Sequence, residues 1–129
     1  MTTLIDCSAL LALIDGGHPM HGMLRHQLAY ELEAEGEVAA TNYVVLETCE
    51  AARRQLGAGS LKALVRDILP ALEIVWVQPA EHELALEVSI ASGQESLSMV
   101  DLTTVLVARR LGVNRFMAVD ERFEEEGLV

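Results

Sequence analysis

The sequence has few basic residues, few cysteines and no long apolar run, and each shortage excludes a class of protein. Nine lysines and arginines stand against 20 acidic residues, for a net charge of −11. That balance argues against nucleic-acid binding through a basic surface, unless bound cations offset the carboxylates. The two cysteines have neither CxxC nor zinc-site spacing. No apolar stretch approaches the ~18 residues that span a bilayer, and no signal peptide is recognisable. We expect a cytoplasmic protein that does not associate with membranes.

What the sequence does contain is an alternation of short apolar runs with helical patterns. At 129 residues with 51% hydrophobic content, it is long enough to bury its own core, so we predict one domain over 1–129. We expect Trp76 to lie in that core. The alternation predicts an α/β fold of three layers, with a mainly parallel central sheet flanked by helices. The predicted strands are 2–6, 38–41, 74–77 and a last one at 116, and the predicted helices are 8–14, 20–35, 43–56, 60–72, 79–91 and 99–111.

An aspartate follows an apolar run at each end of the chain. Asp6 comes directly after Thr3-Leu4-Ile5, and Asp120 comes after Phe116-Met117-Ala118-Val119. The carboxyl ends of parallel strands share one edge of a sheet, where ligand sites of open α/β sheets lie. Either aspartate alone could be a helix cap or a turn residue. Two carboxylates converging on one crevice repel each other, so together they indicate a bound cation.

Two further carboxylates lie near the start of predicted helices. Asp101 shares a helical face with apolar residues, which favours a functional role, although Ser98 and Asp101 also have the spacing of a capping pair. Glu47 lies one turn into the helix after the second strand, close to the expected edge. Helical spacing alone favours the alternative, a solvated face on which Glu50 pairs with Arg54. Glu50 is the reserve candidate for the site.

At these positions the chain resembles the PIN-domain proteins, and most closely the compact VapC-type toxins of bacterial toxin–antitoxin pairs. The four segments come in the family's order and extend over essentially the whole chain. They are 4–11, 41–47, 97–101 and 117–123, the last followed by 127–128.

The resemblance implies a metal-dependent endoribonuclease. Asp6, Glu47, Asp101 and Asp120 match the family's acidic positions and are expected to hold Mg²⁺ or Mn²⁺, with Ser8 supporting the site. We expect Asp6 and Asp101 to be the principal ligands. Glu47 would bind the ion or orient the attacking water, and Asp120 would support a second ion. An all-oxygen donor set suits these metals.

One departure from the family pattern, and the acidic charge balance, keep other functions open. Ala118 stands where the family commonly has Thr or Ser. The implied partners are an RNA substrate, a cognate antitoxin and a second copy of the chain in a homodimer. A catalytically weak module that binds RNA or a partner in a regulatory role is the alternative. A phosphoryl-transfer receiver or phosphatase ranks lower, because the single lysine, Lys62, lies within a predicted helix away from the strand ends.

Overall fold

Four parallel strands form the central sheet of the computed structural model, which describes residues 1–92 and 97–123. Their order is β3-β2-β1-β4, so the first strand lies in the interior beside the last. Leu4 of β1 is in register with Ala39 of β2 on one side and with Phe116 of β4 on the other. The strands are β1 (Thr2–Ile5), β2 (Glu37–Thr41), β3 (Glu73–Val75) and β4 (Phe116–Met117).

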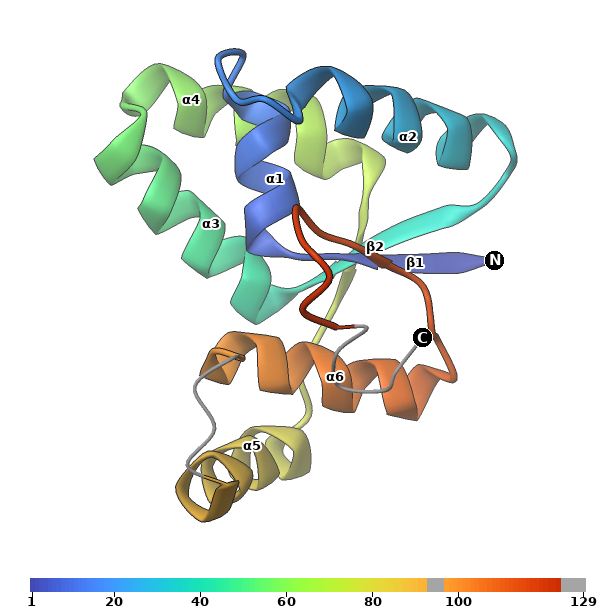
Figure 1. Ribbon diagram of the computed structural model, residues 1–129, viewed down its shortest axis with the longest axis vertical. Helices are drawn as coiled ribbons and strands as arrows, with labels where there is room; N and C mark the ends of the chain where they lie inside the picture. The colour runs from blue at the N-terminus through green and yellow to red at the C-terminus, as the bar shows by residue number, and fades with distance from the viewer. Residues whose placement is uncertain (93–96, 124–129) are drawn as a thin grey trace.

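Helices cover both faces of this sheet (Figure 1), as the alternating pattern predicts. On one face α1 packs against α2 and α3, and on the other α5 packs against α6. The α/β fold with its parallel sheet is therefore confirmed. The helices are α1 (Cys7–Ile14), α2 (His21–Glu33), α3 (Asn42–Gln55), α4 (Ala58–Ala63), α5 (Pro79–Ser92) and α6 (Met99–Leu111).

Neighbouring residues of the interior strands supply the two halves of the core. Ile5 belongs to the larger cluster with side chains of α1 and α2, whereas Leu4 packs with Ala39 and Ala108. Successive side chains of a strand point to opposite faces, so a fully apolar run is what a strand covered on both sides requires. A third cluster joins Leu97, Val105 and Phe123, and it reaches the segment that follows β4.

The structure differs from the prediction along 60–72 and at Trp76. The predicted helix is broken into α4, the π-helical turn η1 (Leu64–Ile68) and the 3₁₀ turn η2 (Leu69–Ala71). Pro70 lies in the last of these, where its missing N–H and fixed φ disfavour a continuous α-helix. The prediction of a buried Trp76 is wrong, since the residue is 67% exposed. The edge strand β3 ends at Val75, so Trp76 has no sheet layer above it.

Two predicted features lie outside the described residues, namely 93–96 of the loop before α6 and the pair 127–128. Within 1–92 and 97–123, no helix combines the length and the hydropathy that a bilayer crossing needs.

Candidate active site

Asp6 is the buried carboxylate of the site and the N-cap of α1. It follows β1 directly, and its Oδ1 accepts hydrogen bonds from the Ala9 backbone N–H (3.0 Å) and from the Ser8 hydroxyl (2.7 Å). The helix-cap role considered for Asp6 from the sequence is therefore present in the structure. The other oxygen, Oδ2, is buried and has no hydrogen-bond partner among the described residues. Burial raises the pKa of this carboxyl to about 6, against the lowering effect of both hydrogen bonds and of Arg122.

Asp101 is the second buried carboxylate and lies in the first turn of α6. The Ser98 hydroxyl accepts from the Asp101 N–H (3.0 Å), and Asp101 Oδ2 accepts from the Ser98 N–H (3.1 Å). This is the capping box that the spacing allows. The capping interpretation and a functional one are compatible here. The same oxygen also lies 3.4 Å from Nη1 of Arg122.

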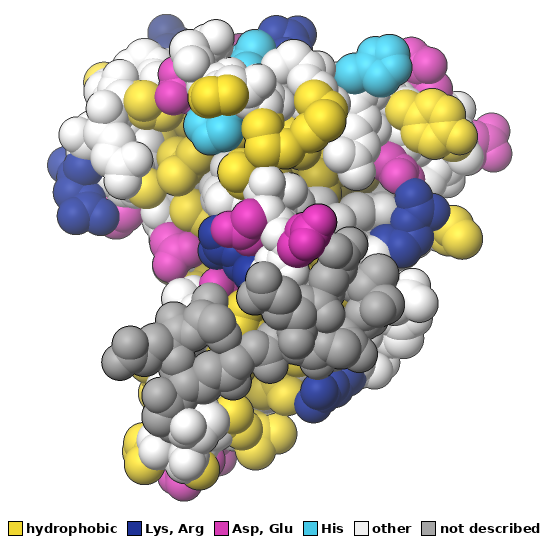
Figure 2. All heavy atoms as spheres, in the orientation of Figure 1, with side chains coloured by type: hydrophobic (Ala, Val, Ile, Leu, Met, Phe, Trp, Pro, Cys, Tyr) yellow, Lys and Arg dark blue, Asp and Glu magenta, His cyan; other side chains and the backbone are white. Residues whose placement is uncertain are grey.

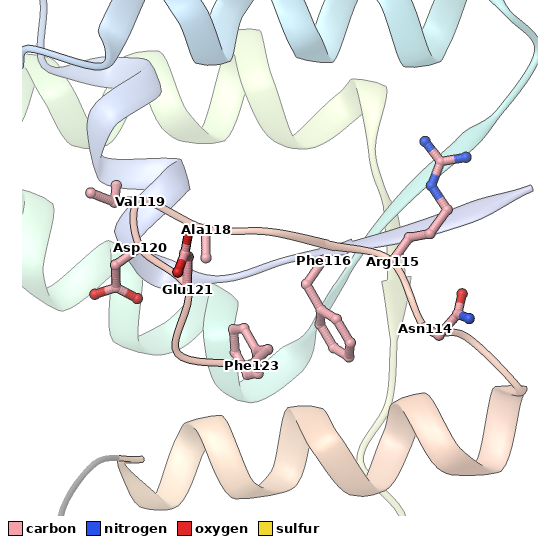
Figure 3. Close-up of a pocket in the computed structure, with 8 residues that line it drawn as sticks. All are labelled: Asn114, Arg115, Phe116, Ala118, Val119, Asp120, Glu121 and Phe123. Atoms are coloured by element: carbon pink, nitrogen blue, oxygen red, sulfur yellow. The ribbon is translucent and has the colours of Figure 1, made fainter. Parts of the chain in front are cut away.

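Asp120 belongs to the exposed turn after β4 and joins the other two aspartates through Arg122. Its Oδ1 accepts from the Arg122 backbone N–H (3.1 Å), which is the turn-forming role weighed from the sequence. Its two oxygens also accept from Arg122 Nε (2.8 Å) and Nη2 (3.0 Å). This paired contact lowers the pKa of Asp120. Figure 3 shows this carboxylate at the bend where the chain turns back after β4, on the other side of the view from Asn114.

Arg122 therefore contacts all three aspartates at once. Its Nε and Nη2 bind the two oxygens of Asp120 as a fork, while its Nη1 lies near Asp101. Nη1 is also 3.8 Å from Asp6 Oδ2, the oxygen that has no hydrogen bond, which is an ion-pair distance too long for a hydrogen bond. Sequence analysis did not single out this residue. The sequence could have pointed to Arg122 through its neighbours. It follows Asp120 by two positions and precedes the apolar Phe123, whose side chain is buried in the core.

Glu47 and Cys7 border this group on the side of α3. Glu47 is half-buried, and burial raises its pKa. Asp101 adds to this rise, whereas a hydrogen bond with Cys7 and the charge of Arg122 oppose it. Burial also raises the pKa of the Cys7 thiol to about 11, so the thiol stays protonated at neutral pH. The predicted Glu50–Arg54 pair is not the one formed, because Glu50 pairs with Arg53 at 2.6 Å.

Ser8 connects the first and last parts of the site. Its Oγ donates to Asp6 and accepts from the Val119 backbone N–H at 3.0 Å. The supporting position predicted for Ser8 agrees with these contacts. Ala118, the departure from the family pattern, packs against the cluster of Leu97, Val105 and Phe123. Ala118 therefore contributes apolar contact where a hydroxyl is common in the family.

The donor set fits a divalent cation, although the side chains are gathered around an arginine. Within the described part of the chain, no three His, Cys, Asp or Glu side chains are arranged to hold a metal ion. The positive charge among the aspartates is instead the guanidinium of Arg122. The orphan oxygen of Asp6 and the all-carboxylate donors are nevertheless what Mg²⁺ and Mn²⁺ prefer.

Comparison with known proteins agrees with this fold and places the chain in a family. The PIN-domain model matches residues 3–127, and the chain belongs to the PIN-domain family, as the four segments predict. Nucleases of this family generally use divalent metal ions. No curated protein is similar enough in sequence to count as a match.

Two solved structures share the fold. One is VapC20 of Mycobacterium tuberculosis, a Sarcin-Ricin loop cleaving toxin, with a TM-score of 0.83 and 24% identity over 100% of this chain and 97% of that one. The other is PAE2754 from Pyrobaculum aerophilum, with a TM-score of 0.61 and 17% identity over 95% of this chain and 82% of that one.

Proposed function

We propose that the protein is a metal-dependent endoribonuclease, the toxin of a type II toxin–antitoxin pair, which hydrolyses RNA phosphodiester bonds. The observation that carries this proposal is the convergence of Asp6, Asp101 and Asp120 on one point at the carboxyl edge of a parallel sheet. Carboxylates gathered at one place need a compensating positive charge, which Arg122 supplies here and which a divalent cation would supply in its place. Membership of the PIN-domain family supports the same chemistry.

We assign metal binding, water orientation and support of Asp6 to different residues according to their burial and contacts. Asp6 and Asp101, the two buried carboxylates, would hold the Mg²⁺ or Mn²⁺ ion, and Asp120 at the exposed rim would support a second one. A bound ion would activate water for attack and neutralise charge developing on the phosphate. Glu47, whose pKa is raised by burial, is suited to orient that water and accept its proton at the carboxylate. Ser8 would hold Asp6 in place through its short hydrogen bond.

RNA and a cognate antitoxin are the proposed partners. The structural neighbour VapC20 is a toxin that cleaves the Sarcin-Ricin loop, which favours RNA as the substrate class. An antitoxin with a basic segment would match the net charge of −11. A groove of ≈ 610 Å³ between α1, α2 and η1 offers apolar lining for such a partner, including Leu13, Leu28 and Leu32. As the toxin of such a pair, the protein would act in the cytoplasm.

We propose a homodimer because helix α5 exposes several large apolar side chains. The only buried residue of this helix is Ala85, whereas Leu84, Leu86, Val88 and Ile90 are all exposed. Yellow hydrophobic side chains are visible over the lower body in Figure 2, where α5 and α6 lie in Figure 1. Leu84 and Val88 share one side of α5, and Leu86 and Ile90 share another, because residues four apart lie on the same side of a helix. Exposed large apolar side chains on both sides favour a partner that covers this helix.

The test is cleavage of a mixed RNA pool by purified protein with Mg²⁺, with Mn²⁺ and with EDTA. Asp6→Asn would run alongside to exclude a contaminating nuclease, and Asp67→Asn, at an exposed position of η1, would serve as the matched control. We expect metal-dependent cutting by the wild type and by Asp67→Asn, and none by Asp6→Asn. Cutting that persists in EDTA, or in Asp6→Asn, would contradict the proposal.

The alternative is a catalytically weak module that binds RNA or a partner in a regulatory role. It is favoured by the arginine whose positive charge lies among the three aspartates and by the alanine at position 118. In the same assay this alternative predicts RNA binding without metal-stimulated cleavage.

A further inference from the structure

Arg122 is held in the acidic site by its neighbours in the chain. On one side, the Val119 N–H donates to Ser8 Oγ at 3.0 Å. On the other, Phe123 is buried at 2% exposure, and its ring stacks on Phe116 with 4.7 Å between centroids. The turn that carries Arg122 is therefore anchored at both ends. The guanidinium is brought to the aspartates by packing, and not by a chance surface contact.

The contacts of the guanidinium are of two kinds. Those to Asp120 are short, at 2.8 and 3.0 Å, whereas those to the buried Asp101 and Asp6 are long, at 3.4 and 3.8 Å. Arg122 is therefore hydrogen-bonded firmly to Asp120 and makes only long contacts with the buried Asp101 and Asp6. It supplies charge to Asp6 Oδ2 without giving it a hydrogen bond.

A divalent cation and this guanidinium cannot both occupy the space between Asp6 and Asp101. They carry like charges, and the two oxygens that Nη1 approaches are the ones that an ion would need. The fork on Asp120 does not depend on those long contacts. Because the guanidinium is rigid, Nη1 leaves the buried pair only if the contact with Asp120 breaks or if Asp120, which is exposed, moves together with Arg122.

We infer that Arg122 is an internal counter-ion, which offsets part of the negative charge of Asp6 and Asp101 in the metal-free protein and has to be displaced when a divalent cation binds. This inference rests on the proposed function, because it assigns the same carboxylates to the metal. As a consequence, Arg122 lowers the affinity of the site for a divalent cation and raises the stability of the metal-free protein.

The experiment measures Mn²⁺ binding by titration calorimetry, and thermal unfolding in EDTA, for wild type, Arg122→Gln and Arg110→Gln. The control loses the same charge from a remote pair, since Arg110 contacts Glu81 and the Trp76 carbonyl. Arg122→Gln should bind Mn²⁺ about tenfold more tightly, because no like charge then opposes the ion. In EDTA the same variant should melt at a lower temperature than the control. Arg122→Lys keeps the charge but loses the fork, and should bind about two- to threefold more tightly.

The outcomes separate this inference from the proposed function. Unchanged or weaker Mn²⁺ binding by both Arg122 variants, with wild-type binding lost in Asp6→Asn, would overturn the counter-ion role and leave the metal site standing. If neither wild type nor Arg122→Gln binds Mn²⁺ in a manner that depends on Asp6, both ideas fail. Should Arg122→Gln not fold, the comparison of Arg122→Lys with wild type decides the inference by itself.

Discussion

The burial of Asp6 predicts that the metal-free protein becomes more stable when this residue is neutralised. Asp6 is only 1% exposed, and burial raises its pKa from 3.8 to about 6. Asn at this position keeps an oxygen that can accept from Ser8 and Ala9. It lacks the negative charge, which the folded state solvates poorly. Asp6→Asn should therefore stabilise the fold at neutral pH.

The size and sign of the effect follow from the pKa. A carboxyl whose pKa is raised by folding binds its proton more tightly in the folded state, so folding is penalised as pH rises. The penalty is absent below pH 3.8, grows between 3.8 and about 6, and is complete above that. At 1.36 kcal/mol per pH unit, this interval corresponds to about 3 kcal/mol. For a domain of this size, that is a rise in Tm of roughly 10 °C.

The assay is urea unfolding of wild type, Asp6→Asn and the exposed control Asp67→Asn, in EDTA, at several pH values from 4 to 8. The free energies of unfolding of wild type and Asp6→Asn should coincide near pH 4 and separate as the pH rises, with Asp6→Asn the more stable. Asp67→Asn should show no such separation. Equal stability of wild type and Asp6→Asn at pH 7.5, or a gain that persists undiminished at pH 4, would refute the reasoning.

Three further substitutions test the rest of the site and its surroundings. Asp101→Asn should abolish metal-dependent RNA cleavage with an unchanged circular dichroism spectrum, because Ser98 still caps α6 and the Asn side-chain oxygen can still accept from the Ser98 N–H; wild-type cleavage rates would contradict its assignment as a ligand. Ser8→Ala removes the hydroxyl shared by Asp6 and Val119 and should cost about 1–3 kcal/mol of unfolding free energy; no loss in urea unfolding would show that these hydrogen bonds do not stabilise the fold. Ile90→Glu places a charge on the exposed surface of α5, where Ile90 is 80% exposed, and should give a monomer in analytical ultracentrifugation where the proposed homodimer predicts twice that mass for the wild type; equal masses for the variant and the wild type would contradict an interface at this surface.

Local patterns were sufficient for the elements of the fold and for the edge that carries the acids. Runs such as Leu4-Ile5 and Val38-Ala39-Ala40 are apolar on both faces, which identifies strands covered by helices on each side. Parallel strands bring their carboxyl ends to one edge, so Asp6 and Asp120 were expected together. The spacing of Ser98 and Asp101 likewise predicted the capping box that the structure contains. The capping box arises within three residues, whereas the meeting of Asp6 and Asp120 also requires that β1 and β4 pair in the sheet.

The cap of α3 and the exposure of Trp76 depended on contacts between segments that are distant in the sequence. Thr41, not Asn42, caps α3, because the Asn42 side chain instead accepts from the Val77 backbone N–H across the β2–β3 edge. Trp76 is of a residue type that is common in strands, but it lies beyond the end of the edge strand β3 and stays exposed.

By itself, then, the sequence determined the parallel α/β fold and the three aspartates of its carboxyl edge, since periodicity, capping and strand burial are local properties. Only the tertiary structure decided which oxygen of Asp6 is left without a hydrogen bond and which cation faces it. Arg122 is two residues from Asp120 but more than a hundred from Asp6, and no local pattern links it to the first strand. The two meet because Phe123 packs on Phe116, Val119 binds Ser8, and β4 pairs with β1. The charge balance of the site is therefore a product of long-range packing, which composition and spacing cannot reveal.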